Sequence, residues 1–250
     1  MRRAAQNLIN EFAKMRHLRL WLVVLALVLG VAGLSVVSAV ASPDFADPAS
    51  RSWRSLLAGL SLGTALVQPL LLAVLASRLV DIEHQGQGWI LPATSGLTPG
   101  RLLRAKLLAL GIVLTVTSAA THLLVLAFGL VMGIAETVPT GVWVGAAVGA
   151  WLVGLIILAL HLWLSTRIEN QLVGLGVGVL GTLLAISSAG LPAWANHLTP
   201  WGHFAFTRAA EWRGDELVLL QPGWPGLIVL VVIGGALFAL ATGRFDRQEV

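Results

Sequence analysis

The residues of this chain best suited to polar chemistry lie in one charged segment, residues 77–106, between two long apolar runs. The segment begins with carboxylates and an imidazole, passes through a tryptophan and ends with basic groups. Its candidate site residues are Asp81, Glu83, His84, Gln85, Trp89 and Arg101. Such groups form ion pairs and charge-assisted hydrogen bonds, and tryptophan adds apolar contact area. This chemistry favours docking of a partner protein over catalysis; the alternative is an ordinary solvated loop.

A second group of polar residues lies inside the apolar runs. Gln68 directly precedes Pro69, and a proline within a helix frees a backbone carbonyl and permits a kink. The next apolar run carries a polar stripe made of Thr115, Thr117, Ser118, Thr121 and His122. Because polar side chains are costly in hydrocarbon, these residues are candidates for the wall of a polar pathway.

The alternative for this polar stripe is structural, with hydroxyls bonded to carbonyls of their own helix. For His122, and for His161 in a later run, we favour one neighbouring partner each over a role in a proton relay. A relay usually needs buried carboxylates, and no Asp or Glu lies inside any of the apolar runs.

The motifs expected of a nucleotide or metal site are missing from the sequence. The two lysines, Lys14 and Lys106, stand in Ala-Lys-Met and Ala-Lys-Leu, so neither completes the Gly-Lys-Ser/Thr end of a P-loop. There is no His-Glu-x-x-His metal motif and no cysteine. His197 and His203 are six residues apart without a clear third ligand. We therefore expect no ATPase activity and no metal site in this chain.

The composition is that of a membrane protein. Hydrophobic residues make up 57% of the 250 residues and charged residues 11%, whereas a soluble domain carries roughly 25% charged residues. Six apolar runs are long enough to cross a bilayer as helices, namely residues 20–41, 56–76, 107–134, 142–164, 172–191 and 223–242. The sequence therefore predicts an all-α polytopic membrane protein with six transmembrane helices. The net charge is only +4, and membrane topology explains the basic residues better than nucleic-acid binding does.

The distribution of lysine and arginine predicts the orientation of the spans, because cytoplasmic loops carry an excess of these residues. If the amino terminus is cytoplasmic, only Arg51, Arg54, Arg208 and Arg213 of the 16 Lys and Arg residues lie in outer segments. We therefore expect a multi-pass protein of a bacterial-type cytoplasmic (plasma) membrane with both termini cytoplasmic. Ala39-Val40-Ala41 fits a signal-peptide cleavage site, but the first run exceeds the usual ~7–15-residue signal core, which favours an uncleaved span.

Two segments outside the spans have patterns of their own. In residues 1–19, apolar residues recur at helical spacing between polar ones, which predicts an interfacial amphipathic helix; the alternative is a disordered basic leader. Residues 192–222 form the only long outer loop, and their mixed apolar and polar pattern predicts short helices resting on the outer membrane face. Residues 77–106 then lie on the cytoplasmic side, as a candidate docking segment between spans two and three.

The charged segment and the amino-terminal helix also resemble a known family. Glu83-His84-Gln85 followed by Gly88-Trp89, then Pro99-x-Arg101 and Lys106, resembles the intracellular segment of type-2 ABC exporter permeases. Within that family the chain is most similar to the lantibiotic-protection (immunity) branch, in which an acidic-His pair precedes tryptophan by a similar gap. Residues 10–16 resemble the Glu-x-x-Lys opening of that branch, whereas Ile90 stands where many relatives have a basic residue.

The resemblance implies one transmembrane permease domain over residues 1–250, which works with a separate cytoplasmic ABC ATP-binding subunit. ATP and Mg would bind to that subunit, and no cofactor to this chain. The resemblance further implies pairing with a second permease copy or a homologous permease, and export of a peptide antibiotic or other amphiphile. Residues 77–106 would couple the ATP-binding subunit to the spans, and Gln68 with the polar stripe would line the pathway. The alternative is a non-transporting membrane scaffold or sensor subunit that binds a ligand through residues 192–222.

Overall fold

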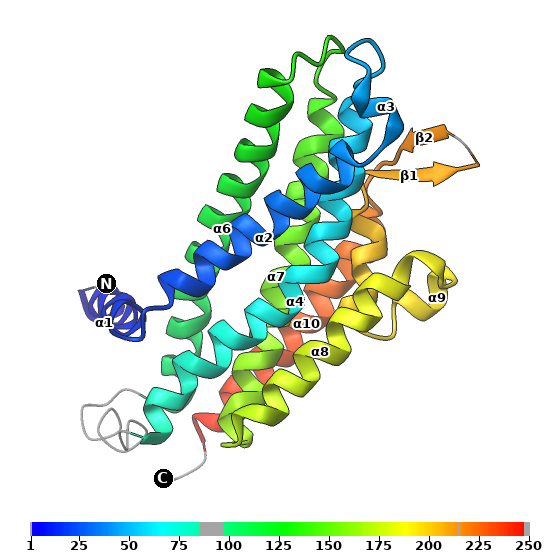
Figure 1. Ribbon diagram of the computed structural model, residues 1–250. Coiled ribbons are helices and arrows are strands. Elements are labelled where there is room, and N and C mark those ends of the chain that lie inside the picture. The colour runs from blue at the N-terminus through cyan, green and yellow to red at the C-terminus, as the bar shows by residue number, and fades with distance from the viewer. Residues whose placement is uncertain (1, 86–97, 215, 248–250) are drawn as a thin grey trace.

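The computed structural model describes residues 2–85, 98–214 and 216–247. Within them, six helices are long and apolar enough to cross a membrane, which confirms the prediction of an all-α, six-span membrane protein. They are α2 (Trp21–Val40), α4 (Trp53–Gln85), α6 (Pro99–Val131), α7 (Thr140–Arg167), α8 (Gln171–Ser187) and α10 (Trp224–Phe245). Helix α1 and the end of α10 lie toward one end of the bundle, here the termini end, and a short β-hairpin lies at the other, the hairpin end (Figure 1).

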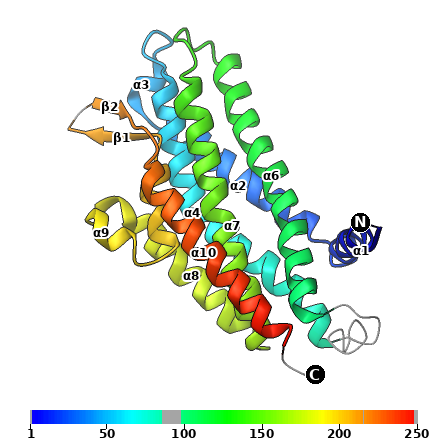
Figure 2. The same cartoon turned by 180° about the vertical axis from the view of Figure 1, so that it is seen from behind.

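Helices α4 and α7 form the centre of the bundle. More than half of the apolar window is buried in α4 (56%) and in α7 (61%), against 22% in α10. Helix α4 packs against α2, α7 and α8, while α7 also packs against α6 and α10. Seen from behind, α10 runs along the outside of α7 (Figure 2). Most of the surface of α10 is therefore left for lipid or for a partner.

Glycines allow α2 and α4 to approach closely. A Cβ at Gly59 would lie 2.5 Å from the carbonyl oxygen of Ser35, and one at Gly63 would lie 2.8 Å from that of Val31. Small residues at this spacing permit backbone contact between membrane helices. With Ser61 between them, the two glycines also match the Gly-x-Ser-x-Gly pattern of a nucleophile elbow. That elbow requires a strand-to-helix turn, whereas here the pattern lies inside α4, so it indicates helix packing.

Two helices extend beyond their predicted spans. Helix α4 continues past residue 76 to Gln85, and α6 begins at Pro99 rather than near residue 107. The first charged residues do not end either helix, because Leu79 and Val80 in α4 and Leu102 and Leu103 in α6 keep a buried apolar face. Both ends of the predicted coupling segment are thus helical continuations of spans two and three. Residues 86–97, which include Trp89, lie outside the described residues.

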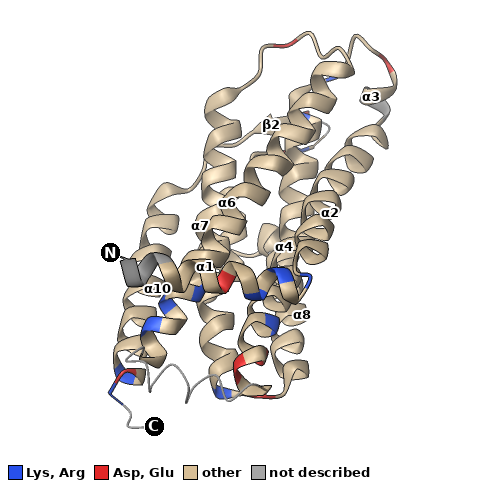
Figure 3. Ribbon diagram, turned by 90° about the vertical axis from the view of Figure 1, so that its left-hand side faces the viewer, with Lys and Arg blue, Asp and Glu red and all other residues tan. Residues whose placement is uncertain are grey.

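The amino-terminal segment forms the expected helix, α1 (Arg2–His17), which crosses the bundle beside α6 (Figure 3). Its end is a Schellman turn, since the Leu20 amide donates to the Met15 carbonyl (3.0 Å) and the Arg19 amide to the Arg16 carbonyl (3.2 Å). Arg19 adopts the left-handed conformation that this turn requires, with φ of 54°. Met15 and Leu20 are both buried at the turn, so α1 is fixed across the bundle where α2 begins.

The connections at the hairpin end differ in part from the prediction. A single helical turn, α3 (Pro43–Ala46), lies between α2 and α4. After α8, the chain forms η1 (Ser188–Gly190), α9 (Ala193–Asn196) and η2 (Trp201–Thr207), as the prediction of short helices required. The antiparallel hairpin of β1 (Ala210–Arg213) and β2 (Glu216–Leu219) was not predicted. Helix η2 packs among α7, α8 and α10, so this part of the loop enters the bundle.

Candidate functional site

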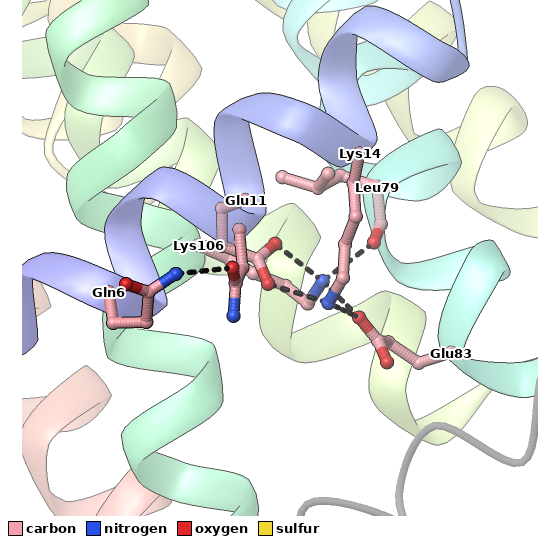
Figure 4. Close-up of polar contacts among 7 residues, drawn as sticks. Gln6, Glu11, Lys14, Leu79, Glu83 and Lys106 are labelled. Atoms are coloured by element: carbon pink, nitrogen blue, oxygen red, sulfur yellow. Dashed lines mark hydrogen bonds and ion pairs between the residues drawn. The ribbon is translucent and has the colours of Figure 1, made fainter. Parts of the chain in front are cut away.

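Four charged side chains from three helices meet in the interior near the termini end (Figure 4). Glu11 and Lys14 come from α1, Glu83 from α4 and Lys106 from α6. Lys106 is 0% exposed, Glu11 1% and Glu83 3%. We call these four residues the buried charge cluster.

Hydrogen bonding within the cluster is nearly complete. The Lys106 ammonium donates to Glu11 Oε2 (2.8 Å), to Glu83 Oε1 (2.6 Å) and to the carbonyl oxygen of Leu79 (2.9 Å), which uses all three of its N–H groups. The Lys14 ammonium donates to Glu11 Oε1 (2.7 Å) and to Glu83 Oε1 (2.5 Å). Two positive and two negative charges therefore share one site, and burial is tolerated because the site is neutral.

The partly exposed member of the cluster is held in its charged form. Burial lowers the pKa of Lys14, but hydrogen bonds and charge attraction from Glu11 and Glu83 raise it by more, so the net pKa lies above the ordinary 10.5. Lys14 therefore stays positively charged at neutral pH, as the neutrality of the cluster requires.

The structure separates the predicted coupling residues into two groups. The Glu83 carboxylate points inward to the cluster, and His84 Nε2 lies 2.9 Å from the carbonyl oxygen of Ser165, which connects α4 to α7. Gln85 Nε2 donates to Asp81 Oδ2 (2.6 Å) on an exposed face, and Arg101 is exposed in the first turns of α6. A direct surface contact is therefore open to Asp81, Gln85 and Arg101 but not to Glu83.

From the sequence, Lys106 belongs to the basic end of residues 77–106, and it was not identified as a buried ion-pair partner. Its partner Glu11 is 95 residues away in sequence. The sequence offered two signals. Glu11 and Lys14 are three residues apart and so share one helix face. Lysine is also rare, since the chain has only Lys14 and Lys106, and both proved to lie in the cluster.

A second polar contact connects α6 to α10 at the termini end. Asp246 accepts from Arg104 Nη2 (2.7 Å) and from the Gly100 amide (2.8 Å). Burial raises the pKa of Asp246, but the nearby Thr98 hydroxyl, the hydrogen bond and charge of Arg104 and the hydrogen bond from the Gly100 amide lower it by more, so the net pKa is below its ordinary value. Any side chain at Gly100 would collide with the Thr242 carbonyl oxygen and the Asp246 carboxylate, which explains glycine there.

Most of the predicted pathway residues do lie together. A small cavity of about 20 Å³, room for about one water, lies among α2, α4, α6 and α7. Its polar lining comprises Thr64, Gln68, Thr117, Ser118, Thr121 and His122. Thr115 lies apart from it, and its hydroxyl accepts a hydrogen bond from Trp151 Nε1 (3.0 Å).

Thr117 and His122 have the bonds within their own helix that were the structural alternative, and Gln68 connects two helices. Gln68 Nε2 donates to the Ala150 carbonyl (3.2 Å) across helices, Thr117 donates to the Leu114 carbonyl (2.9 Å), and His122 Nδ1 lies 2.8 Å from the Ser118 carbonyl. The expected single partner for His161 is not found. Among the described residues its ring nitrogens have no hydrogen-bond partner, and the ring packs edge-on against Trp201.

The sequence matches the family model described as ABC-2 family transporter protein over residues 7–185. The chain belongs to the ABC-2 transporter family. No curated protein matches the sequence. The ABC-2 match spans α1 through most of α8 and so includes the whole buried charge cluster. This ABC-2 chain is thus a multi-pass permease subunit of an ABC transporter, a membrane subunit that works with an ATP-binding partner.

Removal of one charge from the cluster should destabilise the fold more than removal of one positive and one negative charge together. Lys106→Met leaves two buried carboxylates with one lysine, and breaking a buried pair in this way costs about 3–5 kcal/mol. Glu83→Gln combined with Lys106→Met restores neutrality, so the double variant should be more stable than Lys106→Met alone. Unfolding temperatures in detergent test this, with exposed Arg247→Met as the control. A double variant no more stable than Lys106→Met alone would contradict it.

The contact between α6 and α10 should depend on Gly100 more than on the ion pair. Asp246→Asn should cost about 1 kcal/mol or less, since the Arg104 and Asp246 side chains are 46% and 22% exposed. Gly100→Ala should lower the unfolding temperature by more, because its Cβ has no room. The control is Gly243→Ala, where no atom lies within 4 Å of an added Cβ. Equal effects at Gly100 and Gly243 would refute this explanation.

Proposed function

We propose that this permease subunit exports a peptide antibiotic or another amphiphile, driven by ATP hydrolysis on a separate cytoplasmic subunit. That subunit would hold ATP and Mg, and a second copy of this chain or a homologous permease would complete the membrane part. The observation that supports coupling most directly is the buried charge cluster. It joins α1 to the two helices, α4 and α6, between which residues 86–97 lie in sequence.

The distribution of charge supports a cytoplasmic termini end. Lys and Arg residues of α1, of the adjoining ends of α4 and α6, and of α10 gather there (Figure 3). Basic residues of membrane proteins concentrate on the cytoplasmic side. The ATP-binding subunit would therefore meet the chain at the termini end, in a bacterial-type cytoplasmic membrane with both termini inside.

In this proposal the two groups of coupling residues have different roles. Gln85 and Arg101 are exposed, Asp81 is half-buried at the surface, and all three would contact the ATP-binding subunit, as would Trp89. Movement of residues 86–97 would pull on the end of α4 at Gln85 and on the start of α6 at Pro99. Glu83 would act as a positioning residue, because its ion pairs with Lys106 and Lys14 require α4, α6 and α1 to move together.

The cavity around Gln68 would be the closed form of the pathway. At about 20 Å³ it is too small for any amphiphile, so passage would require α2 to separate from α4 and α6. The polar lining would then meet the polar groups of the exported molecule.

One observation favours the sensor alternative. A cleft of about 250 Å³ at the hairpin end lies between β1 and helices α2, α4 and α8. It contains the Arg208–Glu211 ion pair (2.9 Å) and the half-exposed Trp212, which suit a ligand with polar and apolar parts. If the chain is a sensor, Trp212→Ala should abolish the response and Glu83→Gln should not.

Coupling through Glu83 predicts loss of transport without loss of assembly. In the complex reconstituted with its ATP-binding subunit, Glu83→Gln should lower nucleotide-driven transport at least about tenfold, while the ATP-binding subunit still co-purifies. The physical reason is that Glu83 is buried and touches only this chain. Asp81→Asn, on the exposed face, is the matched comparison and should weaken co-purification instead. Normal transport by Glu83→Gln would exclude the coupling role.

The pathway assignment predicts that substitutions at Gln68 and Thr115 have different effects on transport. Gln68→Leu should reduce transport severalfold without loss of the ATP-binding subunit, because it removes the polar wall of the cavity. Thr115→Val is the matched control, since Thr115 lies outside the cavity, and it should transport normally. Transport rates in proteoliposomes measure both. Equal rates for the two variants would place the pathway elsewhere.

A further inference from the structure

A larger groove lies away from the buried charge cluster, between α7 and α10. Its volume is about 630 Å³. Ile156, Ala159 and Leu160 of α7 and Ile233, Gly234 and Leu237 of α10 line its middle. It runs from loop residues His197 and His203 to Arg244 near the end of α10. The ABC-2 family match ends at residue 185, so α10 lies outside it.

The groove is long and almost entirely apolar. Its lining on α10 extends from Val229 to Arg244, which corresponds to about 22 Å of helix. Its lining includes three small residues, Ala159, Gly234 and Ala241, and at Gly234 helix α10 lies close to Ile156 of α7, so the groove follows the surface of the contact between the two helices. This length exceeds one leaflet of a hydrocarbon core that is about 30 Å thick, so a fully extended chain parallel to α10 would fit.

The two ends of the groove differ in charge. At the termini end, Arg244 is exposed, and no carboxylate among the described residues forms an ion pair with it. Trp163 of α7 lines the same end and is 38% exposed. At the other end, burial lowers the pKa of His203, with a hydrogen bond to the Thr199 carbonyl opposing and the neighbouring His197 adding to the decrease. The lowered pKa favours the neutral form of His203 at that end.

We propose that this groove binds an anionic phospholipid of the leaflet at the termini end, with its phosphate on Arg244 and one acyl chain between α7 and α10. Guanidinium groups bind phosphate through paired hydrogen bonds, and a tryptophan ring suits the headgroup boundary. The bound lipid fills the space between α10, the least buried span, and the central helix α7. Its role is to stabilise the position of α10, independently of what the permease exports.

The test compares lipids on the purified full-length chain. Phosphatidylglycerol should raise the unfolding temperature more than phosphatidylcholine and should be retained in native mass spectra. Arg244→Gln should lower the phosphatidylglycerol affinity about fivefold, the effect of one basic residue near a lipid surface. Ala241→Trp should abolish retention by filling the groove. Arg247→Gln, an exposed neighbour, and Val232→Trp, on α10 outside the lining, should behave as the parent.

Three results would overturn the proposal. One is equal stabilisation by phosphatidylglycerol and phosphatidylcholine. Another is equal stabilisation by glycerol phosphate alone, which would mean a phosphate site without an acyl chain. The third is a native mass spectrum that shows a dimer of the chain without bound lipid, when that dimer is absent from the spectrum of Ala241→Trp. This result would mean that a second copy of the chain occupies the groove. Because Arg244 is exposed, Arg244→Gln should fold normally. Its affinity for phosphatidylglycerol therefore tests the proposal even if Ala241→Trp fails to fold.

Discussion

The pairing of buried charges inside the termini end of the bundle is the constraint on which the arrangement of α1, α4 and α6 depends. Two lysines and two glutamates lie in a region where Lys106 has no exposed surface at all. An unpaired charge there would cost several kcal/mol. Glu83 of α4 and Lys106 of α6 neutralise each other, and α1 adds one charge of each sign through Lys14 and Glu11. All three N–H groups of Lys106 have acceptors only when α1 is also in place, because Glu11 is one of those acceptors. The position of an interfacial helix is thus determined by electrostatics inside the bundle.

The two ends of the bundle are therefore held together by different kinds of contact between helices. At the termini end, polar contacts connect α1, α4 and α6, and further contacts join α4 to α7 through His84 and α6 to α10 through Asp246. At the hairpin end, α2 and α4 meet through glycine contacts, apolar packing and a hydrogen bond from Ser35 Oγ to the Leu56 carbonyl (2.8 Å), and among the described residues no ion pair joins two of the membrane-spanning helices there. Directional contacts between charged groups hold a fixed geometry, whereas apolar surfaces can slide over each other. If the ATP-binding subunit meets the chain at the termini end, as proposed, the first property is the one needed there to transmit force.

The sequence was sufficient for the parts of the fold that are set by local pattern. Apolar runs predicted six spans, and helical spacing in residues 1–19 predicted α1. The sequence was insufficient where contacts between residues far apart in the chain determine the structure. The helices do not end at the first charge, because Glu83 and Lys106 neutralise each other across α4 and α6. Only the angle at which α1 crosses α6 brings Glu11 to Lys106, and no periodicity encodes that angle.

The hairpin was missed because each strand has only four residues. Five of the six pathway candidates line one cavity, since they share faces of α4 and α6, whereas Thr115 faces Trp151.

The most direct test of the central claim is a distance measurement between α1 and α6 during the transport cycle. The chain has no cysteine, so spin labels can be placed at Arg16→Cys and Leu108→Cys, both exposed positions. A second pair, Leu108→Cys with Leu172→Cys, reports whether the bundle has changed conformation. If the buried charge cluster makes α1 and α6 one unit, their distance distribution stays the same with and without ATP, and Lys106→Met broadens it. A shift of the α1–α6 distance on ATP binding, or an unchanged narrow distribution in Lys106→Met, would contradict the account.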